Sequence, residues 1–279
     1  MRTEMRITAF LGETITYSEK IREVARFRAA FFLAFFVWIC YNITMKIFAI
    51  GDLHLSTTSQ KPMDIFGSGW EGHFEKIKRD WERKVGADDI VLIPGDISWA
   101  MKLENALPDL RLLAPLKGEK VIIRGNHDYW WNGISKLRAA APDESFHFLQ
   151  TDAVKIGKFV FVGSRGWTSP GSPDFTEQDE KLYKREAERF RLALEEGKRL
   201  QEDGDEIIAL IHYPPFNLKR ESSAFTDLFK EYGVKKVVFG HLHGPTFFPL
   251  KTEKDGIEYF LCSCDKTGFS LVEVFCAEI

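Results

Sequence analysis

The chain has few cysteines, and their spacing excludes two classes of small protein. Its 279 residues contain four cysteines and no C-x-x-C pair, so neither a cysteine-rich zinc site nor a dense disulfide scaffold is expected. Cys262 and Cys264 are separated by one residue, whereas Cys40 and Cys276 stand alone. We therefore expect reduced, buried thiols in a cytoplasmic protein.

Neither sign of charge dominates the sequence. The formal net charge is -3 at pH 7, which excludes non-specific nucleic-acid binding through bulk charge. An anionic substrate must then be held locally, either by metal ions or by a few arginine and lysine side chains.

The N-terminal region lacks a run long enough to cross a membrane. Its apolar stretch, residues 29–41, follows Arg22, Arg26 and Arg28 but is shorter than the about 18 to 20 residues of a spanning helix. It also lacks the small-x-small cleavage site of a signal peptide. We expect residues 1–44 to be an extension outside the catalytic fold, and residues 45–279 to form one domain. The alternative is a weak membrane-surface anchor formed by residues 29–41.

Short apolar runs alternate with amphipathic stretches from Met45 onward, which predicts an α/β architecture. Five runs are continuously apolar and predict strands buried on both faces: residues 47–50, 90–93, 121–123, 207–211 and 237–239. Helical spacing is present over residues 74–85, 103–116 and 177–200, the last being highly charged and expected to be solvent-exposed. Gly157-Lys158 and residues 254–256 predict hairpin turns.

A glycine- or histidine-containing loop follows each of these five apolar runs. In open α/β sheets the residues just past the strand C-termini build the site, so we expect the five loops to converge. They are Gly51-Asp52-Leu53-His54, Gly95-Asp96, Gly125-Asn126-His127-Asp128, His212-Tyr213 and Gly240-His241-Leu242-His243.

The loops offer carboxylate, amide and imidazole donors, and no thiolate. This mixture suits Mn, Fe, Zn or Ni. Each motif alone is weak, because Asp52-x-His54 is commonly a capping or core pair, Gly95-Asp96 a turn, and His212 a core histidine. Their joint occurrence at strand ends indicates a phosphoesterase that uses two metal ions.

The ordered set of motifs resembles the calcineurin-like metallophosphoesterase superfamily from about Met45 to the C-terminus. The resemblance implies a four-layer sandwich of two mixed β-sheets flanked by α-helices. It also implies two divalent metal ions, with manganese preferred in vitro. By position, Asp52, His54 and His243 resemble the ligands of one metal. Asn126, His212 and His241 resemble those of the other, and Asp96 resembles the bridging carboxylate.

The same resemblance assigns His127 as the acid that protonates the leaving group, with Asp128 placed to orient it. Two ions about 3.5 to 4 Å apart can hold a bridging hydroxide for in-line attack on phosphorus. The leaving alkoxide then needs a proton, which His127 is suited to give. The alternative is that His127 is a further ligand or a structural hydrogen-bonding group.

Three residues near the motifs are candidates for substrate contact. Trp99 and Tyr213 can stack on a base or sugar, and Arg165 can bind a phosphate through two N–H groups. The alternative for the aromatic residues, and for Trp130 and Trp131 in particular, is packing beneath the loops.

We therefore expect a cytoplasmic hydrolase of phosphate mono- or diesters that acts on a small phosphate ester or nucleotide. The alternative is a catalytically silent scaffold of the same fold that binds a protein partner, which would be expected to lack some ligands. The sequence does not decide among a nucleotide or cyclic-nucleotide esterase, a nuclease, a phosphoprotein phosphatase and a lipid pyrophosphatase.

Overall fold

The structure is a computed structural model that describes residues 6–8, 14–16, 44–59, 61–245 and 247–278. It divides into two compact units, residues 46–276 and residues 1–45 with 277–279. In the smaller unit, β1 (Arg6–Thr8) pairs antiparallel with β2 (Thr14–Thr16). The apolar stretch 29–41 and Cys40 lie outside the described residues.

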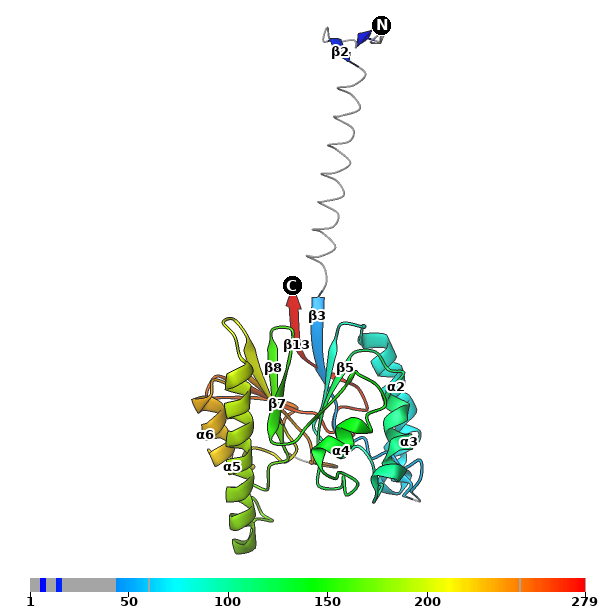
Figure 1. The fold of residues 1–279 in the computed structure, drawn as a ribbon. Coiled ribbons are helices and arrows are strands. Elements are labelled where there is room, and N and C mark those ends of the chain that lie inside the picture. Colours follow the sequence, from blue (N-terminus) through cyan, green and yellow to red (C-terminus); the bar gives the residue numbers. More distant parts are fainter. Residues whose placement is uncertain (1–5, 9–13, 17–43, 60, 246, 279) are drawn as a thin grey trace. The chain divides into compact units, whose positions relative to one another are not determined.

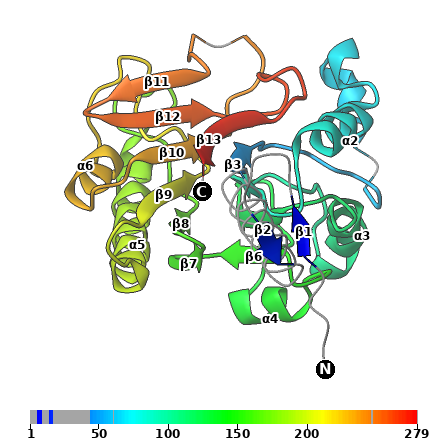
Figure 2. The ribbon, with the colours of Figure 1, turned by 90° about the horizontal axis from the view of Figure 1, so that it is seen from above.

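Two β-sheets form the centre of the larger unit (Figures 1 and 2). The first has the order β13-β3-β4-β5-β6, in which β3 to β6 run parallel. Its strands are β3 (Thr44–Ala49), β4 (Ile90–Ile93), β5 (Glu119–Ile123), β6 (Phe146–Leu149) and β13 (Val272–Glu278).

The second sheet has the order β11-β12-β10-β9-β8-β7. Its four inner strands are parallel, and β7 and β11 add antiparallel edges. The strands are β7 (Asp152–Ile156), β8 (Phe159–Ser164), β9 (Glu206–Ile211), β10 (Lys236–Phe239), β11 (Lys251–Lys254) and β12 (Ile257–Leu261).

Helices cover the outer face of each sheet (Figure 1). The first sheet is covered by α2 (His73–Lys84), α3 (Leu103–Leu113) and α4 (Ile134–Ala139), preceded by the short helices η1 (Met63–Phe66) and η2 (Ser68–Trp70). The second is covered by α5 (Glu177–Leu200) and α6 (Ala224–Glu231). The predicted sandwich of two mixed sheets between helices is confirmed. Among the described helices, none has the length and apolar character needed to span a bilayer.

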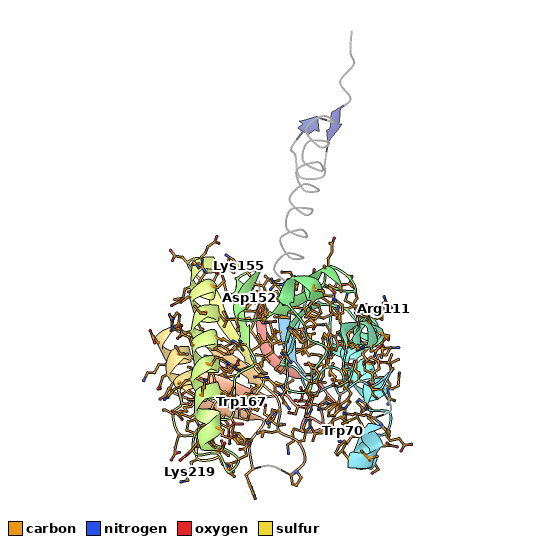
Figure 3. The ribbon with its side chains drawn as sticks, turned by 60° about the horizontal axis from the view of Figure 1, so that its bottom comes forward. Trp70, Arg111, Asp152, Lys155, Trp167 and Lys219 are labelled. Atoms are coloured by element: carbon orange, nitrogen blue, oxygen red, sulfur yellow. The ribbon has the colours of Figure 1, made fainter. Side chains whose placement is uncertain are left out.

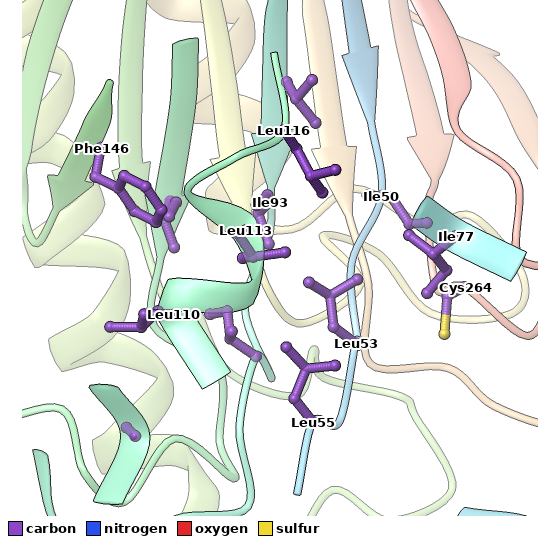
Figure 4. Packing of buried hydrophobic residues seen from close by; sticks show 14 of the residues in the cluster. Ile50, Leu53, Leu55, Ile77, Ile93, Leu110, Leu113, Leu116, Phe146 and Cys264 are labelled. Carbon is purple, nitrogen blue, oxygen red and sulfur yellow. The ribbon is translucent and has the colours of Figure 1, made fainter. Parts of the chain in front are cut away.

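The inner strands are buried on both faces because each sheet has a helix layer on one side and the other sheet on its opposite side. In β4, Val91 and Ile93 belong to the cluster beneath α2 and α3, whereas Ile90 and Leu92 are equally buried but lie outside it. Figure 4 shows Leu113 of α3 near Ile93 in this cluster. This two-sided burial explains why the strands appear in the sequence as continuous apolar runs.

Two expectations about exposure need correction. α5 has the predicted bounds, but it is not exposed all round, because one face, including Phe190 and Leu194, is buried against the second sheet. Of the described cysteines, Cys262 and Cys264 are buried as expected, whereas Cys276 is exposed. The apolar residues of α5 are outnumbered by charged ones but lie on one face of the helix. Cys276 lies near the end of the last strand.

Both predicted hairpins are present. β7 and β8 are joined at Gly157, and β11 and β12 at Gly256. These glycines have φ of 57° and 74°, the left-handed region that glycine adopts without steric cost. The first strand of the second hairpin is Lys251–Lys254.

The contact of α5 with the second sheet requires a glycine at position 197. A Cβ at Gly197 would lie 2.4 Å from Cγ1 of Val162 in β8. Alanine is favoured over glycine in a helix by about 1 kcal/mol, but overpacking costs about 1 to 3 kcal/mol. We therefore predict that Gly197→Ala lowers the free energy of unfolding in urea. Gly133→Ala is the control, because a Cβ there meets nothing within 4 Å. A stabilised Gly197→Ala protein would contradict this packing.

Candidate metal centre

The five predicted loops converge at the C-terminal ends of the parallel strands. They follow β3, β4 and β5 of the first sheet and β9 and β10 of the second. Trp70, at the end of η2, and Trp167, in the loop after β8, lie toward one end of the domain, and Lys155 lies toward the other (Figure 3). Side chains that are almost 200 residues apart in the sequence are therefore brought into direct contact.

A first group of side chains surrounds Asp52. Asp52, His54 and His243 place their donor atoms within 4.8 Å of one another. Nε2 of His243 lies 3.6 Å from Oδ1 of Asp52 and 3.1 Å from Nε2 of His54. One carboxylate and two imidazoles in this arrangement can hold a divalent cation.

A second group surrounds Asn126. Its Oδ1 lies 2.6 Å from Nε2 of His212 and 2.9 Å from Nδ1 of His241. His212 donates its Nδ1–H to the carbonyl oxygen of Pro94, 2.9 Å away, so the neutral ring presents the lone pair of Nε2 to Asn126. The lone pairs of Nε2 of His212 and Oδ1 of Asn126 lie close together and can bind a cation. The donor chemistry of this group therefore fits a metal ion.

Asp96 lies between the two groups. Its Oδ2 is 3.9 Å from Nε2 of His54 and 3.6 Å from Nε2 of His212. Asp52, Asp96 and His212 also form a set that could hold an ion. A buried carboxylate shared by both groups is the geometry expected of a bridging ligand.

The backbone at these loops is held in an uncommon conformation. Asp52, His54, Asp96 and His241 have φ between 46° and 73°, the left-handed region that costs a residue with a Cβ about 1 to 2 kcal/mol. Such conformations persist where the surrounding structure enforces them, and they are frequent at functional sites.

Glycines beside the candidate ligands allow the loops to approach closely. A Cβ at Gly240 would lie 2.4 Å from Oδ2 of Asp52, and one at Gly125 would lie 2.0 Å from Oδ1 of Asp96. The glycines of the Gly-His-x-His and Gly-Asn-His-Asp motifs are therefore required by steric contact with the carboxylates.

Burial sets the protonation states of most of the imidazoles. It lowers the pKa of His54 and His241 to about 3 and that of His212 to about 4, so these rings are neutral at pH 7. Burial also lowers the pKa of His243, but the carboxylates of Asp265 and Asp52 outweigh this effect and raise it to about 10. Neutral imidazoles are the form that binds metals.

Burial raises the pKa of Asp96, and the nearby carboxylates of Asp128 and Asp52 raise it further. Two close carboxylates that repel each other are stabilised by an added cation. The repulsion between these carboxylates is the second reason that the donor set fits a divalent metal ion.

Asp265 is a site residue that the sequence analysis missed. Its Oδ1 lies 2.9 Å from Nδ1 of His243, and its Oδ2 accepts the backbone N–H of Gly244. A carboxylate that holds the far nitrogen of a histidine fixes its orientation. Asp265 follows no motif in the sequence, so only the fold could reveal this contact.

His127 lies beside the first group. Its ring centroid is 5.7 Å from that of His54 and 4.5 Å from that of Trp99, and its backbone N–H donates to Oδ1 of Asp96. Burial, and then the charge of Lys61, lower the pKa of its ring. The protonated ring is therefore a stronger acid than that of an ordinary histidine, although a smaller fraction of the molecules carries this proton at pH 7.

The expected pairing of Asp128 with His127 is not found. The fully buried carboxylate of Asp128 accepts the backbone N–H groups of Asp96, Ile97, Ser98 and Gly125, and Nε1–H of Trp130. Among the described residues, no hydrogen bond joins it to the ring of His127. Asp128 therefore connects the loops after β4 and β5. The error arose because neighbours in a turn need not point the same way.

The three candidate substrate residues differ in position. Trp99 stacks on His54, with ring centroids 4.7 Å apart. The ring centroids of Tyr213 and His241 are 4.2 Å apart. Tyr213 and His241 also line a cavity of about 290 Å³. Arg165 instead places its Nη2 3.6 Å from Oε1 of Glu186. It lines a different cavity, and none of the seven candidate ligands lines that cavity. Trp130 and Trp131 are buried in the core, as the alternative interpretation had it.

A comparison with protein-family models identifies the family of this chain. The family model described as calcineurin-like phosphoesterase matches residues 45–245, more than half of the chain. No curated protein matches. Two solved structures that are similar to this one are the protein of unknown function AQ665 from Aquifex aeolicus and TT1561 of Thermus thermophilus. The first is 13% identical and covers 82% of this chain and 95% of its own, with a TM-score of 0.44. The second is 10% identical and covers 82% and 98%, with a TM-score of 0.48.

The contacts of Asp128 predict a large effect from a small substitution. In Asp128→Asn an NH₂ group would face backbone donors, leaving several buried N–H groups without an acceptor. We expect the free energy of unfolding to fall by about 2 to 4 kcal/mol, measured in urea at pH 8. Asp203→Asn, on the surface, should leave it unchanged. An equally stable Asp128→Asn protein would show that this carboxylate does not hold the loops.

Proposed function

This chain belongs to the calcineurin-like phosphoesterase family, and we propose that it hydrolyses phosphate mono- or diesters with two divalent metal ions. The observation that carries the proposal is the position of Asp96, whose Oδ2 lies within 4 Å of an imidazole nitrogen from each ligand group. We also propose that residues 45–279 form the catalytic domain and that residues 1–44 lie outside it.

The side chains of this site have separate tasks in the proposed reaction. Asp52, His54 and His243 would hold one ion, Asn126, His212 and His241 would hold the other, and Asp96 would contribute to both. When bound, two such ions lower the pKa of water and polarise the phosphoryl group. The neutral amide of Asn126 and the neutral imidazoles add no negative charge, so the site keeps the net positive charge that attracts a phosphate ester.

His127 is the proposed proton donor to the leaving group. It lies beside the first ligand group without a hydrogen bond from its ring to a carboxylate among the described residues, and its lowered pKa favours release of a proton. Trp99 limits the position of the His127 ring, because the two rings are in contact.

The cavity next to His241 and His243 is the proposed place for the rest of the substrate. Tyr213, Phe216 and Leu218 contribute to its lining, together with Ser169 and Asp174. This mixture of apolar and polar groups suits a small organic ester or a nucleoside. Manganese is the metal we propose for assays in vitro.

The scaffold alternative is favoured less, because all seven ligand positions are filled by side chains able to bind metal. A chain that had lost hydrolysis would be expected to have lost some of them.

Removal of the shared carboxylate should abolish metal-dependent hydrolysis. We expect Asp96→Asn and Asp96→Ala to lose more than about hundredfold in turnover of p-nitrophenyl phosphate with Mn²⁺, since even outer partners of metal ligands contribute 10- to 100-fold. Bound metal, measured by mass spectrometry, should fall as well. Asp88→Ala, at an exposed site, is the control. Two ions at full occupancy in Asp96→Asn would refute the shared role.

Loss of the proposed acid should depend on the leaving group. For His127→Ala we expect bound metal to be retained and turnover of ethyl phosphate to fall by about 10². Turnover of p-nitrophenyl phosphate should fall far less, because its leaving group needs no proton. His147→Ala, whose ring pairs with Glu119, is the matched control. An equal loss on both esters would argue against proton donation by His127.

A further inference from the structure

A second cavity, of about 280 Å³, lies beside the candidate metal centre and has a different chemistry. Its lining contains four arginines, Arg124, Arg165, Arg185 and Arg189, and one carboxylate, Glu186. The formal charge of these five side chains is +3, from four guanidinium groups and one carboxylate. The seven candidate metal ligands are absent from its lining, so the proposed hydrolysis does not account for it.

The arginines of this cavity outnumber the acceptors available to them. Arg165, Arg185 and Arg189 all approach the same oxygen, Oε1 of Glu186, at 3.6, 3.3 and 2.8 Å. A guanidinium group has five N–H donors, and one carboxylate oxygen can accept only a few of them. Most N–H groups of this arginine cluster therefore remain available to a ligand.

Two buried atoms of the lining have no hydrogen-bond partner among the described residues. They are Nε of Arg124, which is a donor, and Oε2 of Glu186, which is an acceptor. Glu186 is 1% exposed, and a buried polar atom without a partner costs about 1 to 3 kcal/mol.

We propose that the arginine cluster binds a phosphate-type anion at a site separate from the candidate metal centre. Phosphate oxygens accept N–H groups from arginine in pairs, which suits the unused donors. Hydrogen phosphate also carries one hydroxyl group, which can donate to Oε2 of Glu186 while its other oxygens accept from Arg124. Sulfate has the same size and charge but no hydroxyl group at neutral pH, so the carboxylate of Glu186 disfavours it.

The position of the cavity places this anion close to the proposed reaction. Arg124 directly precedes the Gly-Asn-His-Asp motif, and the carbonyl oxygen of Arg165 accepts the backbone N–H of His212. The required chemistry is that of free hydrogen phosphate, because the phosphate group of a larger ester is a dianion without a hydroxyl group at pH 7.5. The proposal does not depend on hydrolysis, and its test uses binding rather than turnover.

The test is calorimetric titration of the full-length protein, treated with chelator, with sodium phosphate and with sodium sulfate at pH 7.5 and constant ionic strength. We expect phosphate to bind more tightly than sulfate. Arg189→Gln should weaken phosphate binding roughly tenfold, the effect of one lost charge-assisted hydrogen bond. Arg189 is half exposed, so this variant should still fold. Arg199→Gln is the matched control, because Arg199 lies on the same helix but does not line this cavity.

Two further titrations identify what the site recognises. Glu186→Gln removes the negative charge, and it should bring the affinity for sulfate up to that for phosphate. Methyl phosphate is a dianion without a hydroxyl group at this pH, so it should bind more weakly than hydrogen phosphate, as sulfate does. Equal binding of methyl phosphate and hydrogen phosphate would contradict the proposed contact between the hydroxyl group and Glu186. Phosphate binding that is equal in the unaltered protein and in Arg189→Gln, or absent from both, would overturn the proposal.

Discussion

Backbone N–H groups from the loops of the candidate metal centre donate to buried carboxylates, and the rest of the site depends on these hydrogen bonds. Asp128 joins the loop after β4 to the loop after β5. Asp52 accepts the N–H of His241 and so joins the loop after β3 to the loop after β10, across the two sheets. Asp96 accepts the N–H of His127. Buried N–H groups need acceptors, and here side chains supply the acceptors that the ended strands no longer provide.

This arrangement explains how the loops keep a costly backbone conformation. Four candidate ligands have left-handed φ angles, and each is held by hydrogen bonds and by close contact with a neighbouring loop. Two of the carboxylates that hold the loops, Asp52 and Asp96, are also candidate metal ligands. Folding of the loops therefore also places these two carboxylates at the proposed metal centre.

The sequence predicted the strands and the convergence of the loops because both follow from local patterns. Continuous apolar runs mark parallel strands buried on both faces, and the residues that follow them meet at one edge of each sheet. The contacts of Asp128, Asp265 and Glu186 were not predictable in the same way. Asp128 turns away from its sequence neighbour, Asp265 contacts a histidine 22 residues away, and Glu186 meets Arg165 only when α5 packs on the second sheet. Each depends on the direction of a side chain in three dimensions.

Seven side chains from five loops are proposed to form one centre for two divalent ions. The most direct measurement of this centre is the metal stoichiometry of the unaltered protein after chelator treatment and reconstitution with Mn²⁺, together with its electron paramagnetic resonance spectrum. We predict two equivalents of Mn²⁺ per chain and the spectrum of a magnetically coupled pair, because ions in two-metal sites are typically about 3.5 to 4 Å apart. A single equivalent, or two ions with the spectrum of isolated Mn²⁺, would contradict a shared centre.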